Sequence, residues 1–303
     1  MYDIIGDIHG HNDKLKSLLQ KLGYRKIDGT YEHPERKVLF LGDYIDRGPS
    51  IRETLHLVRN MCDNGSAIAL LGNHEYNALC FHVQEYEGGH LRKHLIRNII
   101  QHYETLRQFH NRQEEYEDFL EWFKTLPLFF ETDTFRAVHA TWDATFIHYL
   151  KHRLKDNKLN DELLHESAKK GNKLYLAVDN ILKGRSIPLP DGLTFTDKEG
   201  TVRKEIRIKW WIDPCVSDYK TLSIENLDYL PHRLVDQSQL KSTCYYQENE
   251  IPVFFGHYWL KHKPMIDRSN ICCLDYSVAR NGNLVAYRFD EEKALQSQKL
   301  IYT

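Results

Sequence analysis

The sequence predicts an α/β protein with a largely parallel sheet, and three similar segments near the start of the chain indicate this fold. Each segment is a short, mostly apolar run that stops at a glycine followed by a polar residue, and the runs cover 2–5, 37–41 and 67–71. Buried strands of a parallel sheet have this character and end at turn residues. Helical patterns separate the runs, and alternating strands and helices are typical of a parallel sheet.

The two segments between these strands have the spacing of amphipathic helices. Residues 12–22 carry four leucines at helical spacing, and residues 50–62 place Ile51, Leu55 and Val58 on one face. Apolar side chains three and four positions apart share a face, so each helix can cover the sheet. Ligands of such sheets bind beyond the carboxyl ends of the strands, where the polar residues of this chain stand.

The later chain predicts further helices and a return to strands. Residues 85–124 have a charged helical pattern, which Pro127 ends. Short apolar runs predict five more strands, at 128–131, 135–138, 253–255, 271–278 and 284–289. The last two flank Asn281-Gly282, a strong signal for a hairpin turn.

Residues 143–200 have a different character from the segments on either side. Helical patterns at 144–163 and 167–182 precede a loop rich in proline and glycine. We expect a single domain over residues 1–303, in which 143–200 forms a helical insertion or cap over the site. A helical elaboration without a catalytic part explains the same pattern equally well.

The composition argues against several classes of protein. Lys and Arg number 41 against 43 Asp and Glu, so no basic excess is present to neutralise a nucleic-acid backbone. No apolar run approaches the ~18 residues of a membrane span. A glycine turn at Gly6 follows Met1 too closely for a signal peptide, and the six cysteines include no C-x-x-C pair. We therefore expect a cytoplasmic protein with no membrane partner and no nucleic-acid partner.

Residues that could bind metal follow several of the predicted strands. They are Asp7, His9, Asp43, Asn73, His139 and His257. Carboxylate, imidazole and amide side chains suit divalent metals such as Mn, Fe or Zn. Asp7 and His9 would point to opposite faces of a continuing strand, but they can converge in a turn, which Gly6 and Gly10 permit.

The spelling of these blocks is similar to that of a known family. The sequence contains G-D-I-H-G, G-D-Y-I-D-R-G and G-N-H-E in this order, followed by two histidines at strand ends. This arrangement resembles the calcineurin-like metallophosphoesterases, in particular the phosphoprotein phosphatase branch and the bacterial symmetrical and PrpE-type diadenosine tetraphosphatases. The resemblance covers most of the chain and least of 143–200. It implies a four-layer α/β/β/α sandwich with a helical insertion.

The resemblance also implies two divalent metal ions, with Mn favoured and Fe or Zn as alternatives. One ion would be bound by Asp7, His9 and Asp43. The other would be bound by Asp43, Asn73, His139 and His257, so that Asp43 bridges the pair. Paired ions of this kind activate a shared water, and the resulting hydroxide would attack phosphorus directly.

Three further residues receive roles from the resemblance. His74 would protonate the leaving group, and Asp46 would orient His74. Arg47 would bind phosphate oxygens, for which a guanidinium group is well shaped. Taken singly, Asp43 could cap a helix, Asp46 and Arg47 could form a surface pair, and the histidines could be structural; their order along the chain favours the site.

Other polar and aromatic residues have simpler explanations. Glu75 more plausibly stabilises its loop than binds metal, and the aromatic segment K-W-W-I-D-P at 209–214 is expected to pack at a sheet edge. His148 and His152 lie one helical turn apart and could bind metal, although solvated side chains are the favoured explanation.

Three features depart from the family that the chain resembles. Ala140-Thr141-Trp142 follows His139, where a glycine is usual, and Tyr258-Trp259 follows His257; these aromatic side chains either line the substrate site or pack. No residue matches the family's second phosphate-binding arginine. The candidates are Arg185, Arg203, Arg207 and Arg233.

The favoured function is metal-dependent hydrolysis of phosphomonoesters, as in serine/threonine protein phosphatases. The partner would be a phosphorylated substrate, either a phosphoprotein or a small phosphoester or nucleotide. The first alternative is hydrolysis of dinucleoside polyphosphates, because Leu274-Asp275 and 284–286 resemble the end of the tetraphosphatases. A second is a non-catalytic binding module that keeps the fold, and a nuclease is a third.

Overall fold

Two β-sheets pack face to face in the computed structural model, which describes residues 1–303 except 197–199, 226 and 241. The first sheet has the strand order β14-β15-β1-β4-β5, with β16 beside β15, and the second has the order β13-β12-β7-β6. The first consists of β1 (Tyr2–Ile5), β4 (Lys37–Phe40), β5 (Ala67–Ala69), β14 (Asp275–Tyr276), β15 (Asn283–Phe289) and β16 (Leu300–Tyr302). The second consists of β6 (Phe129–Glu131), β7 (Arg136–Val138), β12 (Val253–Phe255) and β13 (Ile271–Cys273).

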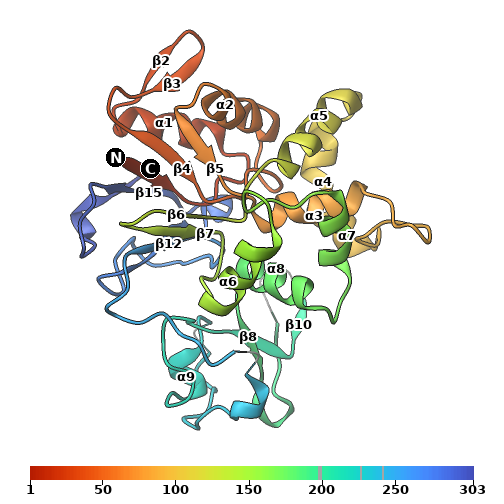
Figure 1. Cartoon of the computed structure of the whole chain (residues 1–303), viewed down its shortest axis with the longest axis vertical. Coiled ribbons are helices and arrows are strands. Elements are labelled where there is room, and N and C mark those ends of the chain that lie inside the picture. Colours follow the sequence, from red (N-terminus) through yellow and green to blue (C-terminus); the bar gives the residue numbers. More distant parts are fainter. Residues whose placement is uncertain (197–199, 226, 241) are drawn as a thin grey trace.

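Helices cover the outer face of each sheet. On one side lie α1 (Asn12–Lys21) and α2 (Ile51–Asp63), and on the other lie α6 (Ala144–Arg153) and α8 (Lys173–Lys183) (Figure 1). A separate apolar cluster fills the space between the sheets, with Leu39 from the first sheet and Phe254 from the second among its members. The predicted four-layer α/β/β/α sandwich is therefore confirmed.

Parallel pairing brings the ends of the strands to one edge. Ile5 of β1 lies beside Phe40 of β4, and Phe40 lies beside Ala69 of β5. In the second sheet, β12 runs parallel to β7. The loops that follow these five strands therefore begin close together, as expected from the sequence.

Glycine lets two of these loops touch. Gly42 has φ +103°, and a Cβ atom on it would lie 2.5 Å from the Cα of Gly72. A Cβ atom on Gly72 would lie 2.2 Å from the backbone nitrogen of Asp43. Any larger residue at either position would push the loops after β4 and β5 apart.

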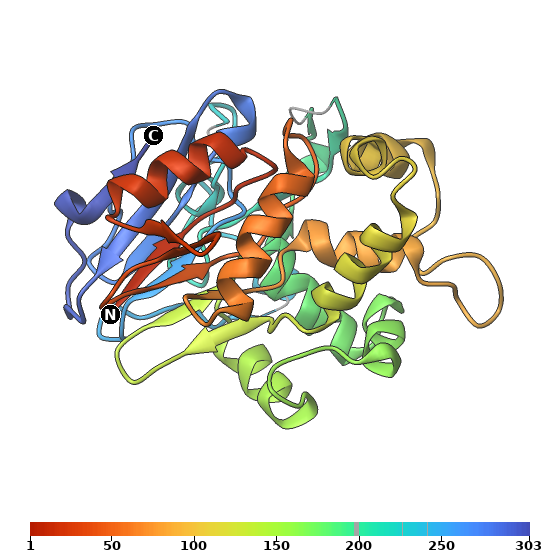
Figure 2. The same cartoon turned by 90° about the horizontal axis from the view of Figure 1, so that it is seen from above.

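A helical group lies beside the sandwich in Figure 2 and consists of α3 (Asn73–His82), α4 (Ile96–Gln108) and α5 (Gln113–Lys124). The predicted helical region at 85–124 is thus confirmed from residue 96 onward, whereas 83–95 is a loop. The predicted strand at 271–278 is also divided. Its first part pairs with β12 as β13, and its second part pairs with β15 as β14, because the chain crosses between the sheets at Leu274. The hairpin at Asn281-Gly282 is confirmed.

Residues 143–200 form more elements than the sequence predicts. The helix expected at 144–163 ends at Arg153, because Asp156 and Asn157 have positive φ and Asn160 caps a new helix, α7 (Asp161–Ala168). Beyond α8, β8 (Ser186–Pro188) pairs with β11 (Glu205–Arg207), and α9 (Tyr219–Leu222) packs with them in a small separate core. The single-domain organisation and the role of 143–200 as a cap stay predictions.

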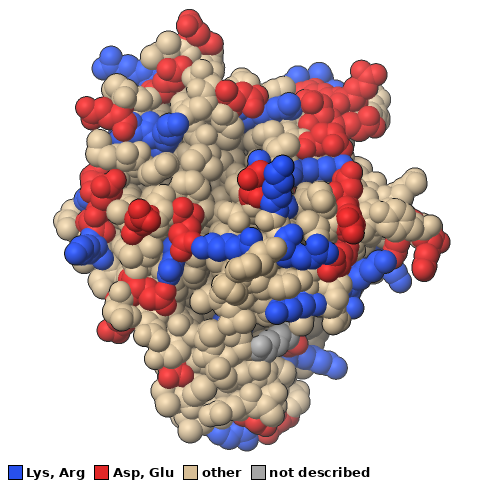
Figure 3. Space-filling view, in the orientation of Figure 1, with Lys and Arg blue, Asp and Glu red and all other residues tan. Residues whose placement is uncertain are grey.

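The remaining short strands are β2 (Arg25–Ile27), β3 (Thr30–Glu32), β9 (Phe195–Thr196) and β10 (Val202–Arg203). Within the part of the chain that the structure describes, no helix has the length and apolar character needed to cross a membrane. Acidic and basic side chains are interspersed over the face drawn in Figure 3, and the absence of a nucleic-acid partner stays a prediction.

Candidate metal centre

The six predicted ligands converge at the shared edge of the two sheets, and all six side chains are buried. Nε2 of His139 lies 3.5 Å from Oδ1 of Asp43 and 3.0 Å from Oδ1 of Asn73. Nδ1 of His257 lies 2.7 Å from the same oxygen of Asn73, and Nε2 of His9 lies 3.6 Å from Oδ2 of Asp43. Positions from 9 to 257 in the chain thus meet within one site.

Two overlapping groups of side chains could each hold an ion. One consists of Asp7, Asp43 and His139, and the other of His9, Asp43 and His74, with the ligand atoms of each group within 4.8 Å of one another. Asp43 belongs to both groups, which is the property that a bridging carboxylate needs. The predicted ligand sets stay predictions, but the structure brings all of their members together.

The orientation of two imidazoles fits metal binding. His9 donates from Nδ1 to the carbonyl of Ile45 at 2.9 Å, and His139 donates from Nδ1 to the carbonyl of Leu41 at 2.8 Å. These hydrogen bonds leave Nε2 of each ring directed into the site as a lone pair. Nε2 of His9 is buried and has no hydrogen-bond partner among the described residues, as expected of an atom placed to bind a cation.

The electrostatics of the site also favour a cation. Burial raises the pKa of Asp7 well above its ordinary value, and the nearby carboxylates of Asp275 and Asp43 raise it further. Burial, together with the charge of Arg47, lowers the pKa of His9 well below its ordinary value, so this ring is neutral and can act as a ligand. A bound divalent cation would stabilise the ionised carboxylates.

Glu75 organises the loop that carries Asp43. Its buried carboxylate accepts hydrogen bonds from the backbone N–H groups of Asp43 at 2.9 Å, Tyr44 at 2.8 Å, Gly72 at 3.1 Å and Ile45 at 3.2 Å. The prediction that Glu75 stabilises its loop is therefore confirmed.

His74 and Asp46 form a buried pair beside the candidate metal centre. Nδ1 of His74 donates to Oδ2 of Asp46 at 2.5 Å, and Nε2 of His74 lies 3.3 Å from a guanidinium nitrogen of Arg47. Burial alone would lower the pKa of His74, but the charge of Asp43 and the hydrogen bond to Asp46 outweigh it and raise the pKa above its ordinary value. Asp46 and Arg47 both have positive φ, a strained conformation that is common at functional sites.

Sequence reasoning missed the residues behind this pair. His102 and Thr105 of α4 both bind Oδ1 of Asp46, at 2.8 and 2.6 Å. Their spacing of three positions on a predicted helix, with polar side chains facing the same way, is the signal that could have found them.

Two of the aromatic residues that follow the late histidines pack in the core. Trp142 is buried against Phe129, and the hydroxyl of Tyr258 lies 2.9 Å from that of Thr141. Trp259 differs, because the guanidinium carbon of Arg47 lies 3.6 Å from its ring centroid. Trp259 thus contacts the predicted phosphate-binding Arg47, whereas Tyr258 packs edge-on against the ring of the predicted ligand His257.

Trp210 and Trp211 pack against Phe255, which confirms the predicted aromatic packing at 209–214.

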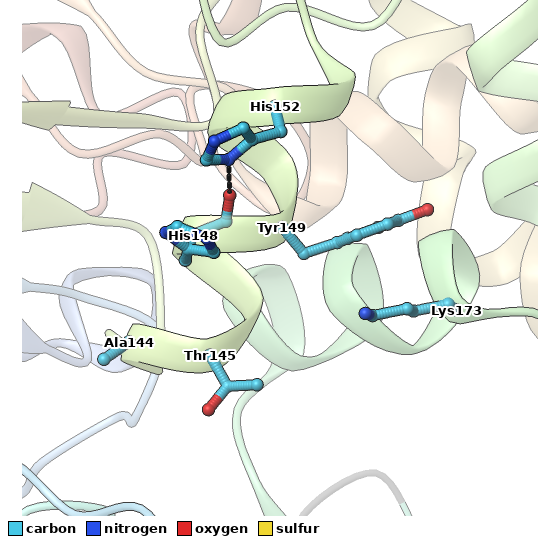
Figure 4. A pocket seen from close by; sticks show the side chains of 6 residues that line it. All are labelled: Ala144, Thr145, His148, Tyr149, His152 and Lys173. Atoms are coloured by element: carbon cyan, nitrogen blue, oxygen red, sulfur yellow. Dashed lines mark hydrogen bonds between the residues drawn. The ribbon is translucent and has the colours of Figure 1, made fainter.

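His148 and His152 lie on the exposed face of α6 and line a cavity of about 570 Å³ away from the candidate metal centre (Figure 4). Nδ1 of His152 donates to the backbone carbonyl of His148 at 2.8 Å. Among the described residues, the groups that could hold a metal ion include neither histidine.

The arginine candidates fall into different environments. Arg185 is buried, and one of its guanidinium nitrogens lies 2.5 Å from the carboxylate of Asp143. A guanidinium nitrogen of Arg233 lies 3.3 Å from the carboxylate of Asp191. Burial, together with the charge of Arg207, lowers the pKa of His257 well below its ordinary value. Arg280, which the sequence did not single out, lies with its guanidinium carbon 5.2 Å from the ring centroid of Trp259.

A buried set of carboxylate, imidazole and amide side chains at the edge of two facing sheets, beside a histidine–aspartate pair, is the arrangement expected of a metal-dependent phosphoesterase. A sequence model of the calcineurin-like phosphoesterase family matches residues 2–212, and the chain belongs to that family. Members of this family typically bind a pair of divalent metal ions.

Curated relatives carry a common name. The bis(5'-nucleosyl)-tetraphosphatase PrpE [asymmetrical] of Bacillus subtilis (strain 168) is 32% identical over 171 residues, which is 55% of this chain and 68% of the relative. The protein of the same name from Halalkalibacterium halodurans is 46% identical over 74 residues, which is 24% of this chain and 30% of the relative. The chain thus spans less than a third of the length of some of these relatives. A solved serine/threonine phosphatase from Saccharomyces cerevisiae aligns over 100% of this chain and 78% of its own, at 13% identity and a TM-score of 0.49.

Proposed function

We propose that this chain hydrolyses dinucleoside polyphosphates, using two divalent metal ions held by the six converging side chains. A metal pair at this site would supply positive charge to the phosphate oxygens and activate water for direct attack on phosphorus. Manganese is the favoured metal, because carboxylate, imidazole and amide oxygen and nitrogen donors suit it, with iron or zinc as alternatives. A cytoplasmic location, expected from the cysteine usage, belongs to the same proposal.

The residues around the centre perform the remaining steps. Asp46 accepts the Nδ1 proton of His74 and thereby turns Nε2 toward Arg47 and the site. His74 is placed to donate a proton from Nε2 to the leaving oxygen, and Arg47 is placed to bind the phosphate that is attacked.

The observation that carries the choice of substrate is the pair of guanidinium groups around Trp259. Arg47 lies 3.6 Å from the indole centroid, beside the metal centre, and Arg280 lies 5.2 Å from the same centroid. The backbone N–H of Trp259 donates to the buried carboxylate of Asp275 at 2.7 Å, which anchors the Trp259 backbone to β14. A chain of phosphates that starts at Arg47 would meet a second cation at Arg280, whereas a single phosphate group would contact only the first. The names of the curated relatives support the same substrate class.

Hydrolysis of phosphomonoesters, including phosphoserine and phosphothreonine in proteins, is the second candidate. The raised pKa of His74 favours it, because a protonated imidazole is most useful when the leaving group is an alkoxide. A nucleotide phosphate leaves as a much weaker base and depends less on an acid.

A substrate panel under Mn²⁺ decides between the two. Diadenosine tetraphosphate, p-nitrophenyl phosphate and a phosphoserine peptide should be compared by kcat/KM, with His74→Asn as a matched variant. Preference for diadenosine tetraphosphate by more than about tenfold would support our proposal, and preference for the phosphopeptide would overturn it in favour of the second candidate. Equally negligible hydrolysis by wild type and His74→Asn would indicate a non-catalytic module, and degradation of single-stranded DNA would indicate a nuclease.

A further inference from the structure

His102 lies directly behind the His74–Asp46 pair. Its Nδ1 atom is 2.8 Å from Oδ1 of Asp46, and its Nε2 atom is 2.8 Å from the hydroxyl of Tyr116. Asp46 therefore sits between two imidazoles, His74 on Oδ2 and His102 on Oδ1. The imidazole of His102 and the Asp46 carboxylate are almost completely buried, so water does not compete for these hydrogen bonds.

The hydrogen bonds define the proton positions in this chain of residues. Because the ionised Asp46 only accepts, the proton of His102 must be on Nδ1. When His102 carries a single proton, its Nε2 atom accepts the hydroxyl proton of Tyr116, and this hydrogen bond favours that tautomer. Asp46 is held as a carboxylate, because His102 and His74 outweigh burial and keep its pKa well below its ordinary value.

Thr105 also forms hydrogen bonds with Asp46. Its hydroxyl donates to Oδ1 of the carboxylate at 2.6 Å and accepts the backbone N–H of Asp46 at 3.0 Å. Both carboxylate oxygens are thus engaged, and the side chain cannot rotate away from His74 without breaking hydrogen bonds in a buried environment.

Helix α4, which supplies these contacts, is unusual because the side chains that it buries are polar. His102 and Thr105 are the buried residues of α4, whereas Ile96 and Ile100 are 77% and 69% exposed. Amphipathic helices ordinarily bury their apolar face, and burying polar groups is costly unless they are hydrogen-bonded. The inward face of α4 is therefore better explained by its contacts with Asp46 than by core packing.

We infer that His102 is a positioning residue for the reaction, which holds Asp46 so that His74 presents its Nε2 atom to the leaving oxygen. Tyr116 extends the same role by fixing the tautomer of His102. This inference rests on the proposed role of His74 as proton donor, but not on the identity of the substrate.

Two substitutions at one position test the inference. His102→Leu removes the donor to Asp46, whereas His102→Asn places an amide N–H near the position of Nδ1. Rates should be measured with a series of aryl phosphates whose leaving groups differ in pKa, under Mn²⁺. His102→Leu should lower kcat about tenfold or more with KM little changed, a size typical of residues that orient a functional group. The loss should be larger for poorer leaving groups, and His102→Asn should recover most of it.

Further measurements exclude a merely structural effect. Metal content and Tm should be followed for each variant, and Tyr116→Phe, which keeps the aromatic ring, should show a smaller loss of kcat with the same dependence on leaving group. In a His74→Asn background, His102→Leu should cost nothing more, because both act on one proton transfer.

Equal losses for good and poor leaving groups, or additive losses with His74→Asn, would overturn the inference. If His102→Leu does not fold, a His102→Asn variant with wild-type dependence on leaving group supports the inference, and one with the full loss contradicts it. Failure of the proposed role of His74 is distinguishable, because His74→Asn alone would then leave hydrolysis unchanged.

Discussion

The carboxylate of Glu75 accepts the backbone N–H of Asp43 at 2.9 Å, so a residue outside both candidate metal groups fixes the loop of the residue that those groups share. The same carboxylate accepts the N–H of Gly72, at the start of α3. One buried side chain therefore joins the loops after β4 and β5 and holds Asp43 in its left-handed conformation, with φ +57°.

Glu75→Gln should destabilise the protein and weaken metal binding. Glutamine keeps the shape, but its NH₂ group would face backbone N–H donors and leave them unsatisfied, at a cost of about 1–3 kcal/mol. Thermal unfolding should show a lower Tm, and calorimetric titration with Mn²⁺ should show a weaker affinity. Glu114→Gln, at an exposed position on α5, is the control and should change neither quantity. An unaltered Mn²⁺ affinity in Glu75→Gln would contradict the role assigned to Glu75.

Asp43→Asn should remove both ions, whereas His9→Ala should remove only one. Asp43 belongs to both candidate groups, while His9 belongs to one of them. Elemental analysis after reconstitution with Mn²⁺ and gel filtration measures the ions retained per chain. Asp13→Asn, an exposed carboxylate on α1, should keep the wild-type content. Retention of the full metal content by Asp43→Asn would argue against a bridging role.

Arg280→Gln should weaken binding of polyphosphates selectively. A charge-assisted hydrogen bond contributes on the order of 1.5–3 kcal/mol, so KM for diadenosine tetraphosphate should rise about tenfold or more. KM for p-nitrophenyl phosphate should stay close to the wild-type value, because its single phosphate would contact Arg47 alone. Arg97→Gln, on the exposed side of α4, is the matched control. A parallel rise of KM for both substrates would remove the support for a second phosphate position.

His82 should make the protein sensitive to mild acid. Burial lowers the pKa of His82 to about 4, and the neighbouring rings of His102, His94 and His90 act in the same direction. The unfolded chain binds a proton near the ordinary pKa of about 6.5, so the folded state binds fewer protons between these values. The contribution of neutral His82 to stability is therefore present above about pH 6.5 and is lost as the pH falls toward 4.

Tm measured at about pH 7 and pH 5 checks this expectation. His82→Phe keeps the ring contacts with Phe81 and Tyr116 and should lose less Tm on acidification than the wild type. His148→Phe, at an exposed position, should behave like the wild type. An equal acid-induced loss of Tm in wild type and His82→Phe would show that His82 is not the responsible group.

Much of the candidate site could be predicted from local sequence. The strands before Gly6, Gly42 and Gly72 each end in a turn that glycine permits, and a parallel sheet brings those turns to one edge. The predicted helices at 12–22 and 50–62 are confirmed as α1 and α2. They could be predicted because the spacing of apolar residues along a short segment indicates which face of a helix will be buried.

The sequence was less informative where a residue acts through a distant partner. Trp142 and Tyr258 pack in the core, whereas Trp259 contacts Arg47. The sequence could not predict this difference, because all three are aromatic residues soon after a strand. The helix at 144–163 was predicted too long, because charged residues in a turn resemble those on an exposed helix face.

The amino-acid sequence by itself determined the order of the turns that carry the metal ligands and the family. It also placed Asp46 and His74 in one set of motifs. Only the tertiary structure decided that His102 supports Asp46 and that Arg280 lies beside Trp259. The physical reason is the range of the interactions. Turns and helix faces follow from neighbouring residues, whereas His102 lies 56 positions from Asp46, and Trp259 and Arg280 follow strands of different sheets.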